Sequence, residues 1–119
     1  MVPGRCTFPR SQRLTNARQY QDVLKHGERM VGRGFVCYAV RREAQGCKLG
    51  LIVSRKVGKA VVRNRVKRFV REFYRTHRGA MAADVHLVVA ARTASARMSR
   101  PECADTMEDL LRRGGVLLG

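Results

Sequence analysis

A run of cations interleaved with apolar residues occupies positions 54–75 of the sequence. At about 100° per residue, the spacing of an α-helix, the apolar members gather on one side, which should face a core. They are Val62, Val66, Phe69, Val70 and Phe73. The polar residues of the same run include Lys56, Lys59, Arg63, Asn64, Arg65, Lys67, Arg68 and Arg71. The pattern predicts a basic helix that docks on a core by its apolar side.

The spacing of these cations indicates what they bind. Solvated helices usually place Glu four residues from Lys or Arg, which stabilises the helix by roughly 0.2–0.5 kcal/mol per pair. Here Arg63, Lys67, Arg71 and Arg75 follow one another at this spacing, and Glu72 is the only acid in the run. Because an external polyanion would remove the repulsion, we favour a nucleic-acid-binding surface over a merely solvated face.

The chain as a whole is also basic. Its 119 residues include 25 Lys and Arg against 9 Asp and Glu, which gives a formal net charge of +16 and a pI near 11.3. The length fits one domain, and the charge favours a nucleic-acid partner over a membrane surface. The apolar runs are far shorter than the roughly 20 residues that span a bilayer, and the N-terminus lacks a signal-peptide pattern. We therefore expect a cytoplasmic protein without membrane contact.

Groups that could perform hydrolysis are few and scattered. A protein nuclease needs a general base and acid, or clustered carboxylates that hold metal ions. His26 and His77 fall near the ends of two predicted helices and His86 falls inside an apolar strand, so no two share an evident site. On the last predicted helix a solvated face is favoured over a metal site for Asp105, Glu108 and Asp109. We therefore predict no catalytic residue and no metal ligand, and assign the chemistry to a partner.

Periodicity predicts two further helices and four strands around the basic helix. Helical spacing covers 16–25, and a capping-box pattern at Ser99 and Glu102 begins a last helix. Strand patterns cover 28–31, 35–40, 47–53 and 84–91, and we expect the second and third to form a hairpin. Gly50 within the third strand indicates a bulge or a close backbone approach. The prediction is one α+β domain in two layers, with a four-stranded sheet, over residues 13–119, preceded by a flexible basic arm at 1–12.

Residues 50–68, with Arg63-Asn64-Arg65 near their end, resemble the signature of the protein subunit of bacterial ribonuclease P. Residues 20–27 resemble the first helix of that family, 35–38 the strand that follows, and 84–92 the last strand. The similarity extends over roughly residues 13–111. It implies the element order α-β-β-β-α-β-α, a fold like that of the second domain of ribosomal protein S5, and a left-handed βαβ crossover.

The resemblance also implies a function. Family members pair with a catalytic RNA that removes the 5′ leader of precursor tRNA by metal-dependent hydrolysis, with Mg²⁺ used by the RNA. By matching position, the residues that bind this RNA are Lys56, Lys59, Arg63, Asn64, Arg65, Lys67, Arg68 and Arg71. Those that line a cleft for the leader, between the first helix and the sheet, are Tyr20, Leu24, Val36 and Tyr38. Outside the complex we expect a monomer.

Several points remain open at this stage. Exposed aromatic rings beside cations suit unpaired bases, but Tyr20 and Tyr38 could also be ordinary half-buried tyrosines. Leu24 stands where the family commonly has a larger aromatic, Ile52 where it has Ser, and Arg55 where it has Lys. A basic ribosomal or ribosome-assembly protein is the alternative function, since charge and fold suit it equally. An autonomous basic ribonuclease would need the acid–base pair that the sequence lacks.

Overall fold

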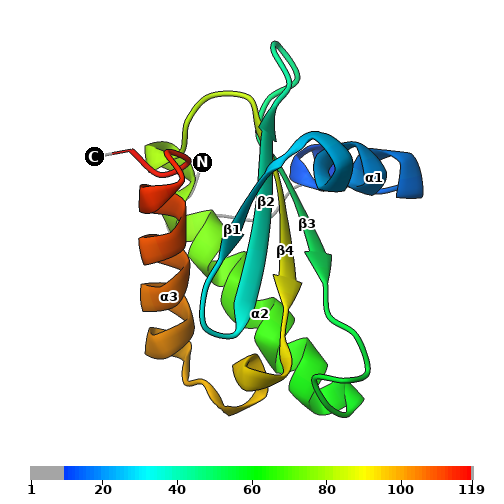
Figure 1. Ribbon diagram of the computed structural model, residues 1–119, viewed down its shortest axis with the longest axis vertical. Helices are drawn as coiled ribbons and strands as arrows, with labels where there is room; N and C mark the ends of the chain where they lie inside the picture. The colour runs from blue at the N-terminus through cyan, green and yellow to red at the C-terminus, as the bar shows by residue number, and fades with distance from the viewer. Residues whose placement is uncertain (1–9, 119) are drawn as a thin grey trace.

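The computed structural model describes residues 10–118, which form a single α+β domain (Figure 1). A short 3₁₀ turn, Arg10–Gln12, precedes the first helix, and the predicted arm at 1–12 otherwise lies outside the described residues. The elements in chain order are α1 (Ala17–His26), β1 (Glu28–Val31), β2 (Phe35–Arg41), β3 (Lys48–Ile52), α2 (Ala60–His77), β4 (Val85–Ala91) and α3 (Arg100–Arg113). The predicted order of helices and strands is confirmed.

The four strands form one sheet in the order β1-β2-β4-β3. β1 pairs with β2 and β2 with β4 in antiparallel fashion, whereas β3 and β4 are parallel. The predicted hairpin of β2 with β3 is therefore wrong, because β4 lies between them. Residues 85–89 of β4 are all buried, and a strand buried on both faces belongs at the centre of a sheet. The hairpin is formed instead by β1 and β2.

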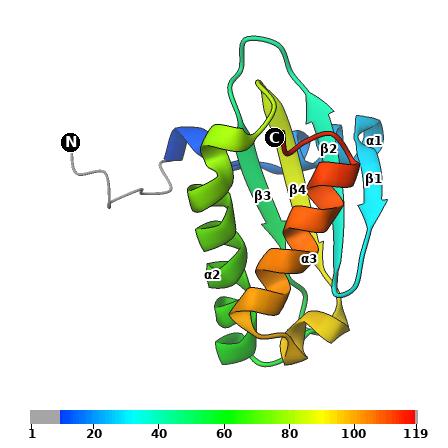
Figure 2. The same cartoon turned by 90° about the vertical axis from the view of Figure 1, so that its left-hand side faces the viewer.

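α2 connects the parallel neighbours β3 and β4. In Figure 2 both strands run downward, α2 and α3 lie on the viewer's side of the sheet, and the chain passes from β3 on the left to β4 on its right. This is a left-handed crossover. The right-handed form occurs in about 98% of such connections, so hydrophobic pattern alone favours the other hand. The handedness implied by the family resemblance is confirmed.

The sheet is covered differently on its two faces. On one face, the side chains of α2 and α3, among them Val70 and Met107, pack with Phe35 and Leu87 in the main core. On the other face, Val23 of α1 packs with Leu14 and Val88, against partly buried Tyr20, Tyr38 and Val40. Figure 1 shows that α1 crosses only the upper part of this second face. Within residues 10–118, no helix covers the lower strand ends on this face.

Local capping explains where the helices begin. Asn16 accepts a hydrogen bond from the Gln19 amide, and the Gln19 side chain accepts one from the Asn16 amide, so both form a capping box at the start of α1. The predicted capping box of Ser99 and Glu102 is confirmed at the start of α3. α2 has no side-chain cap, because its N-cap residue is Lys59. The start of the basic helix therefore leaves amide groups without a side-chain acceptor.

Candidate nucleic-acid interface

α2 carries cations that the fold leaves unneutralised. Its buried side is made by Val66, Val70, Phe73 and Tyr74, so the predicted apolar stripe faces the core as expected. None of the predicted RNA-binding residues forms an ion pair within residues 10–118. Five of these residues are exposed, namely Lys56, Lys59, Asn64, Arg68 and Arg71. The other three are half-buried, namely Arg63, Arg65 and Lys67. The single acid of α2, Glu72, lies 2.8 Å from Arg100 of α3 and is occupied there. The cations of α2 thus face solvent without a counter-charge.

The two arginines of the Arg63-Asn64-Arg65 motif point to opposite flanks of α2. Arg63 donates from Nε to the carbonyl of Gly58 at 3.2 Å, at the start of the helix. Arg65 donates from Nη2 to the carbonyl of Ala96 at 2.6 Å, in the 3₁₀ turn Thr93–Arg97. Asn64 between them is exposed. Arg65 therefore has a structural role that its place in the motif did not reveal, since it ties α2 to the turn before α3.

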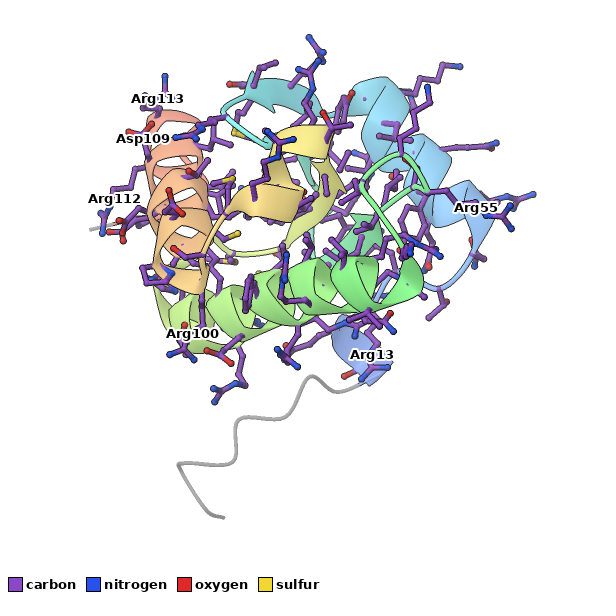
Figure 3. The ribbon with its side chains drawn as sticks, turned by 90° about the horizontal axis from the view of Figure 1, so that it is seen from below. Arg13, Arg55, Arg100, Asp109, Arg112 and Arg113 are labelled. Carbon is purple, nitrogen blue, oxygen red and sulfur yellow. The ribbon has the colours of Figure 1, made fainter. Side chains whose placement is uncertain are left out.

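A groove of about 260 Å³ runs beside α2, between this helix and the β3 edge of the sheet. Lys67 and Arg71 enter it from α2 and Tyr20 enters it from α1. The remaining lining residues are Arg13, Leu14, Leu49 and Leu51. Arg13, labelled in Figure 3, was not among the predicted site residues. It is placed there because the next residue, Leu14, donates its amide to the Leu49 carbonyl at 3.0 Å, which holds residues 13–14 against the edge of β3.

Tyr20 is fixed in position by the backbone of β3. Its hydroxyl accepts a hydrogen bond from the Leu51 amide at 3.1 Å and lies 3.5 Å from the Leu51 carbonyl. Its ring lies against Gly50, where a Cβ would come within 2.7 Å of the Tyr20 Cε2. The close approach predicted at Gly50 is therefore confirmed, and its partner is Tyr20. Tyr20 braces α1 on the sheet and at the same time forms part of the groove wall.

The other residues predicted to contact a leader lie on the α1 face of the sheet, with different exposure. Leu24 of α1 is 38% exposed, whereas Val36 of β2 is only 5% exposed. Tyr38 is half-buried against the Val23 and Val88 cluster. Within this group Leu24 and Tyr38 offer the most accessible surface, and Val36 forms the floor of the site.

Comparison with known proteins identifies the family of the chain. The sequence model of the ribonuclease P family, described as Ribonuclease P, matches residues 8–115. The chain belongs to the ribonuclease P protein family. It is 39% identical over 105 residues to the ribonuclease P protein component of Exiguobacterium sibiricum, a match that covers 87% of this chain and 90% of the relative. It is 37% identical to that of Shouchella clausii, over 91% of this chain and 89% of the relative.

Solved structures of the same family share the fold. The ribonuclease P protein of Staphylococcus aureus superimposes with a TM-score of 0.83 at 28% identity, over 89% of this chain and 97% of that one. The protein from Thermotoga maritima gives a TM-score of 0.77 at 30% identity, over 85% of this chain and 96% of that one. The chain is thus a protein component of ribonuclease P, a subunit of an endoribonuclease that acts in tRNA processing, and membership of the family implies association with ribonuclease P RNA.

Three ionisable groups outside α2 have pKa values that their surroundings lower. Asp22 lies 2.7 Å from Arg42, whose hydrogen bond lowers the pKa of the carboxyl to about 2. His86 is buried on β4, and this burial lowers the pKa of its ring below the usual value. Asp84 accepts hydrogen bonds from the amides of Ala44 and Gly46, which lower the pKa of its carboxyl. Asp22 and Asp84 each fix a local contact, and all three groups lie apart from the groove beside α2.

Two acids of α3 pair with arginines of the same helix, and Asp105 is exposed. Glu108 lies 2.9 Å from Arg112 and Asp109 lies 2.8 Å from Arg113, each one helical turn along. Within residues 10–118, no three His, Cys, Asp or Glu side chains are grouped so that they could hold a metal ion. In the same range, no helix has both the length and the apolar composition to cross a membrane. The part of the chain that the structure describes therefore offers a cationic surface on α2 and no assembled set of metal ligands.

Proposed function

We propose that the cations of α2 bind the phosphates of ribonuclease P RNA, and that the α1 face of the sheet contacts the 5′ leader of precursor tRNA. The observation that carries the first part is the absence of any ion pair, within residues 10–118, for the cations of α2. Each phosphate that a cation neutralises releases a bound counterion, which favours the complex at low salt. The contact fixes the protein on the RNA without reading base sequence.

The second part rests on the position of Tyr20, Leu24, Val36 and Tyr38. They come from α1 and β2, on the sheet face opposite to the main core. Stacking of a base on an aromatic ring contributes roughly 1–3 kcal/mol and tolerates any base. A surface of this kind suits a leader whose sequence varies among tRNAs. Leu24 offers an apolar contact rather than a stacking surface. Val36 is buried beneath the other side chains and offers little surface of its own.

Catalysis in this proposal belongs to the RNA subunit. Mg²⁺ bound by the RNA would activate the water that cleaves the phosphodiester. The protein raises the local concentration of the leader and offsets charge repulsion between two RNA molecules. We propose that the protein is monomeric outside the holoenzyme and that it works in the cytoplasm, as the bacterial enzyme does.

The test is cleavage of a 5′-extended precursor tRNA at near-physiological Mg²⁺. Three reactions are compared: the protein alone, a bacterial ribonuclease P RNA alone, and both together. We expect efficient cleavage at the mature 5′ end only in the mixture. Cleavage by the protein alone would reveal an active site of its own, and a protein that never assists the RNA would contradict the proposed role.

A further inference from the structure

The α1 face of the sheet carries an apolar row that extends beyond the predicted leader site. Cross-strand pairing places Val31 of β1 opposite Val36 of β2, Val36 opposite Ala90 of β4, and Ala90 opposite Ile52 of β3. Directly paired residues in a sheet share a face. The four side chains therefore form one row across the whole sheet. Strands lie about 4.8 Å apart, so the row is roughly 14 Å long.

This row lies beyond the reach of α1. In the cluster under α1, Val23 of the helix packs on Val88, Tyr38 and Val40, which lie nearer to α1 on β4 and β2 than the row does. Figure 1 shows the lower strand ends, where the row lies, below α1. The two ends of the row are the most open, since Val31 is 47% exposed and Ile52 is 36% exposed. Between them Val36 is only 5% exposed and Ala90 is half-buried, so the row is a continuous apolar floor that opens to solvent at its two ends.

Two cations border the row on the same face. Arg29 precedes Val31 by two positions on β1 and pairs with Tyr38, so it lies beside the row at its β1 end. Arg92 follows Ala90 by two positions, and its amide donates to the Gly34 carbonyl, which continues the extended chain of β4. Both arginines are exposed. Within residues 10–118 neither of them forms an ion pair.

We infer that the leader continues from Tyr38 and Val36 across β1, with Val31 and Arg29 as additional contacts for its part farthest from the cleavage site. The inference rests on the proposed function, because it extends the same single-stranded path. An apolar row with cations along its border suits single-stranded RNA, whose bases lie on the row while its phosphates face the arginines. A row of this length accommodates up to about four stacked nucleotides at 3.4 Å each.

The direction of the path follows from charge. The cations of α2 and the groove beside them lie at the β3 side of the sheet, where the proposal puts the catalytic RNA. The part of the leader next to the cleavage site should stay near that RNA. The part of the leader farther from the cleavage site can then lie along the apolar row toward β1, the strand at the opposite edge of the sheet. Val31 and Arg29 should matter only when the leader is long enough to reach them.

The experiment measures affinity of the assembled holoenzyme for precursor tRNAs whose leaders are lengthened one nucleotide at a time. The test variants are Val31→Ser and Arg29→Ala, both at exposed positions. Arg112→Ala, on α3, is the control for loss of one positive charge. Tyr38→Leu, which keeps an apolar side chain and removes the ring, reports on the proposed leader site itself. For each variant, the ratio of its Kd to that of the wild type is plotted against leader length.

We expect the ratio for Val31→Ser and Arg29→Ala to stay near one for short leaders and to rise to about fivefold once the leader spans β1. For Arg29→Ala, the slope of log Kd against log salt for long leaders should also fall by about one, the value for a single phosphate. Arg112→Ala should leave the ratio flat. If Tyr38→Leu weakens binding but the two β1 variants stay flat at every length, the inference is wrong and the proposed function stands. If all of them stay flat, the leader contact itself is wrong.

Discussion

α2 and α3 pack side by side on the same face of the sheet, and both expose several arginines (Figure 2). They differ in what lies next to those arginines. On α3, Arg112 and Arg113 each have a carboxylate one turn earlier, Glu108 and Asp109, at 2.9 and 2.8 Å. On α2, Arg63, Lys67 and Arg71 follow one another at the same spacing with no acid between them.

The difference supports the proposal that α2, rather than α3, carries the RNA-binding surface. Pairs such as those of α3 stabilise a solvated helix by roughly 0.3–0.5 kcal/mol each and leave little net charge to attract RNA. The like-charged series of α2 destabilises the free helix by a similar amount, and a polyanion removes that penalty. Figure 3 shows Arg112, Arg113 and Asp109 on the outer side of α3, away from Arg13 and the groove beside α2.

The strongest way to break this comparison is to neutralise three cations on each helix in turn. We expect Arg63→Ala/Lys67→Ala/Arg71→Ala to weaken binding of ribonuclease P RNA about a hundredfold, since each charged donor contributes at least about 1 kcal/mol to binding. The slope of log Kd against log salt should fall by roughly two to three, about one for each phosphate that the variant no longer neutralises. Binding is measured by titration of labelled RNA across a salt series.

The matched control is Arg100→Ala/Arg112→Ala/Arg113→Ala, which removes the same charge from α3. It should change RNA affinity less than about threefold and lower the free energy of unfolding by roughly 1 kcal/mol, because the variant removes three exposed ion pairs. The α2 variant should lose no more than about 1 kcal/mol, because relief of the like-charge repulsion offsets part of the loss of the Arg63 hydrogen bond to the Gly58 carbonyl. Equal losses of RNA affinity in the two triple variants would contradict the assignment of the interface to α2.

A second prediction separates binding from anchoring within α2. Arg65 and Arg68 both carry one positive charge, but only Arg65 donates to the Ala96 carbonyl, at 2.6 Å. We expect Arg65→Ala and Arg68→Ala to weaken RNA binding by similar factors of about tenfold. Only Arg65→Ala should also lower the free energy of unfolding, by about 1–2 kcal/mol, because it leaves a part-buried carbonyl without its donor.

Chemical denaturation of both variants without RNA checks this difference. Arg65→Lys is the informative companion, because it keeps the charge but loses the planar donor group. It should recover part of the RNA affinity and little of the stability. If Arg68→Ala lost as much stability as Arg65→Ala, the bond to Ala96 would not be the cause.

The comparison of helices could largely be made from sequence, whereas the sheet could not. Charge spacing separates α2 from α3, and the apolar stripe of α2 and the capping box of α3 are local patterns that the fold keeps. The order of the strands depends on a non-local choice, namely that β4 enters between β2 and β3. Proximity in sequence favoured a hairpin of β2 with β3, but the fully buried β4 needs a neighbour on each side.

The candidate site was predictable in the same uneven way. The cations of α2 and the close approach at Gly50 follow from residue type and spacing. The place of Arg13 in the groove depends on the pairing of residues 13–14 with β3, and the bond of Arg65 depends on where residue 96 lies in space. Such contacts join segments that the sequence keeps apart by more than 30 residues, so no local pattern could indicate them.

The finest test of the comparison unpairs the cations of α3 without removing them. Glu108→Gln/Asp109→Asn leaves Arg112 and Arg113 without carboxylates, so that the outer side of α3 gains the charge character of α2. We expect the free energy of unfolding to fall by less than about 1 kcal/mol, because both pairs are exposed. Affinity for ribonuclease P RNA should change less than about twofold, since α2 and the groove beside it keep their shape and charge.

Binding to unrelated RNA at low salt should rise slightly, because two more cations are free to attract phosphates. A large gain in affinity for ribonuclease P RNA would mean that free charge on any helix suffices, and that the position of α2 beside the groove contributes nothing.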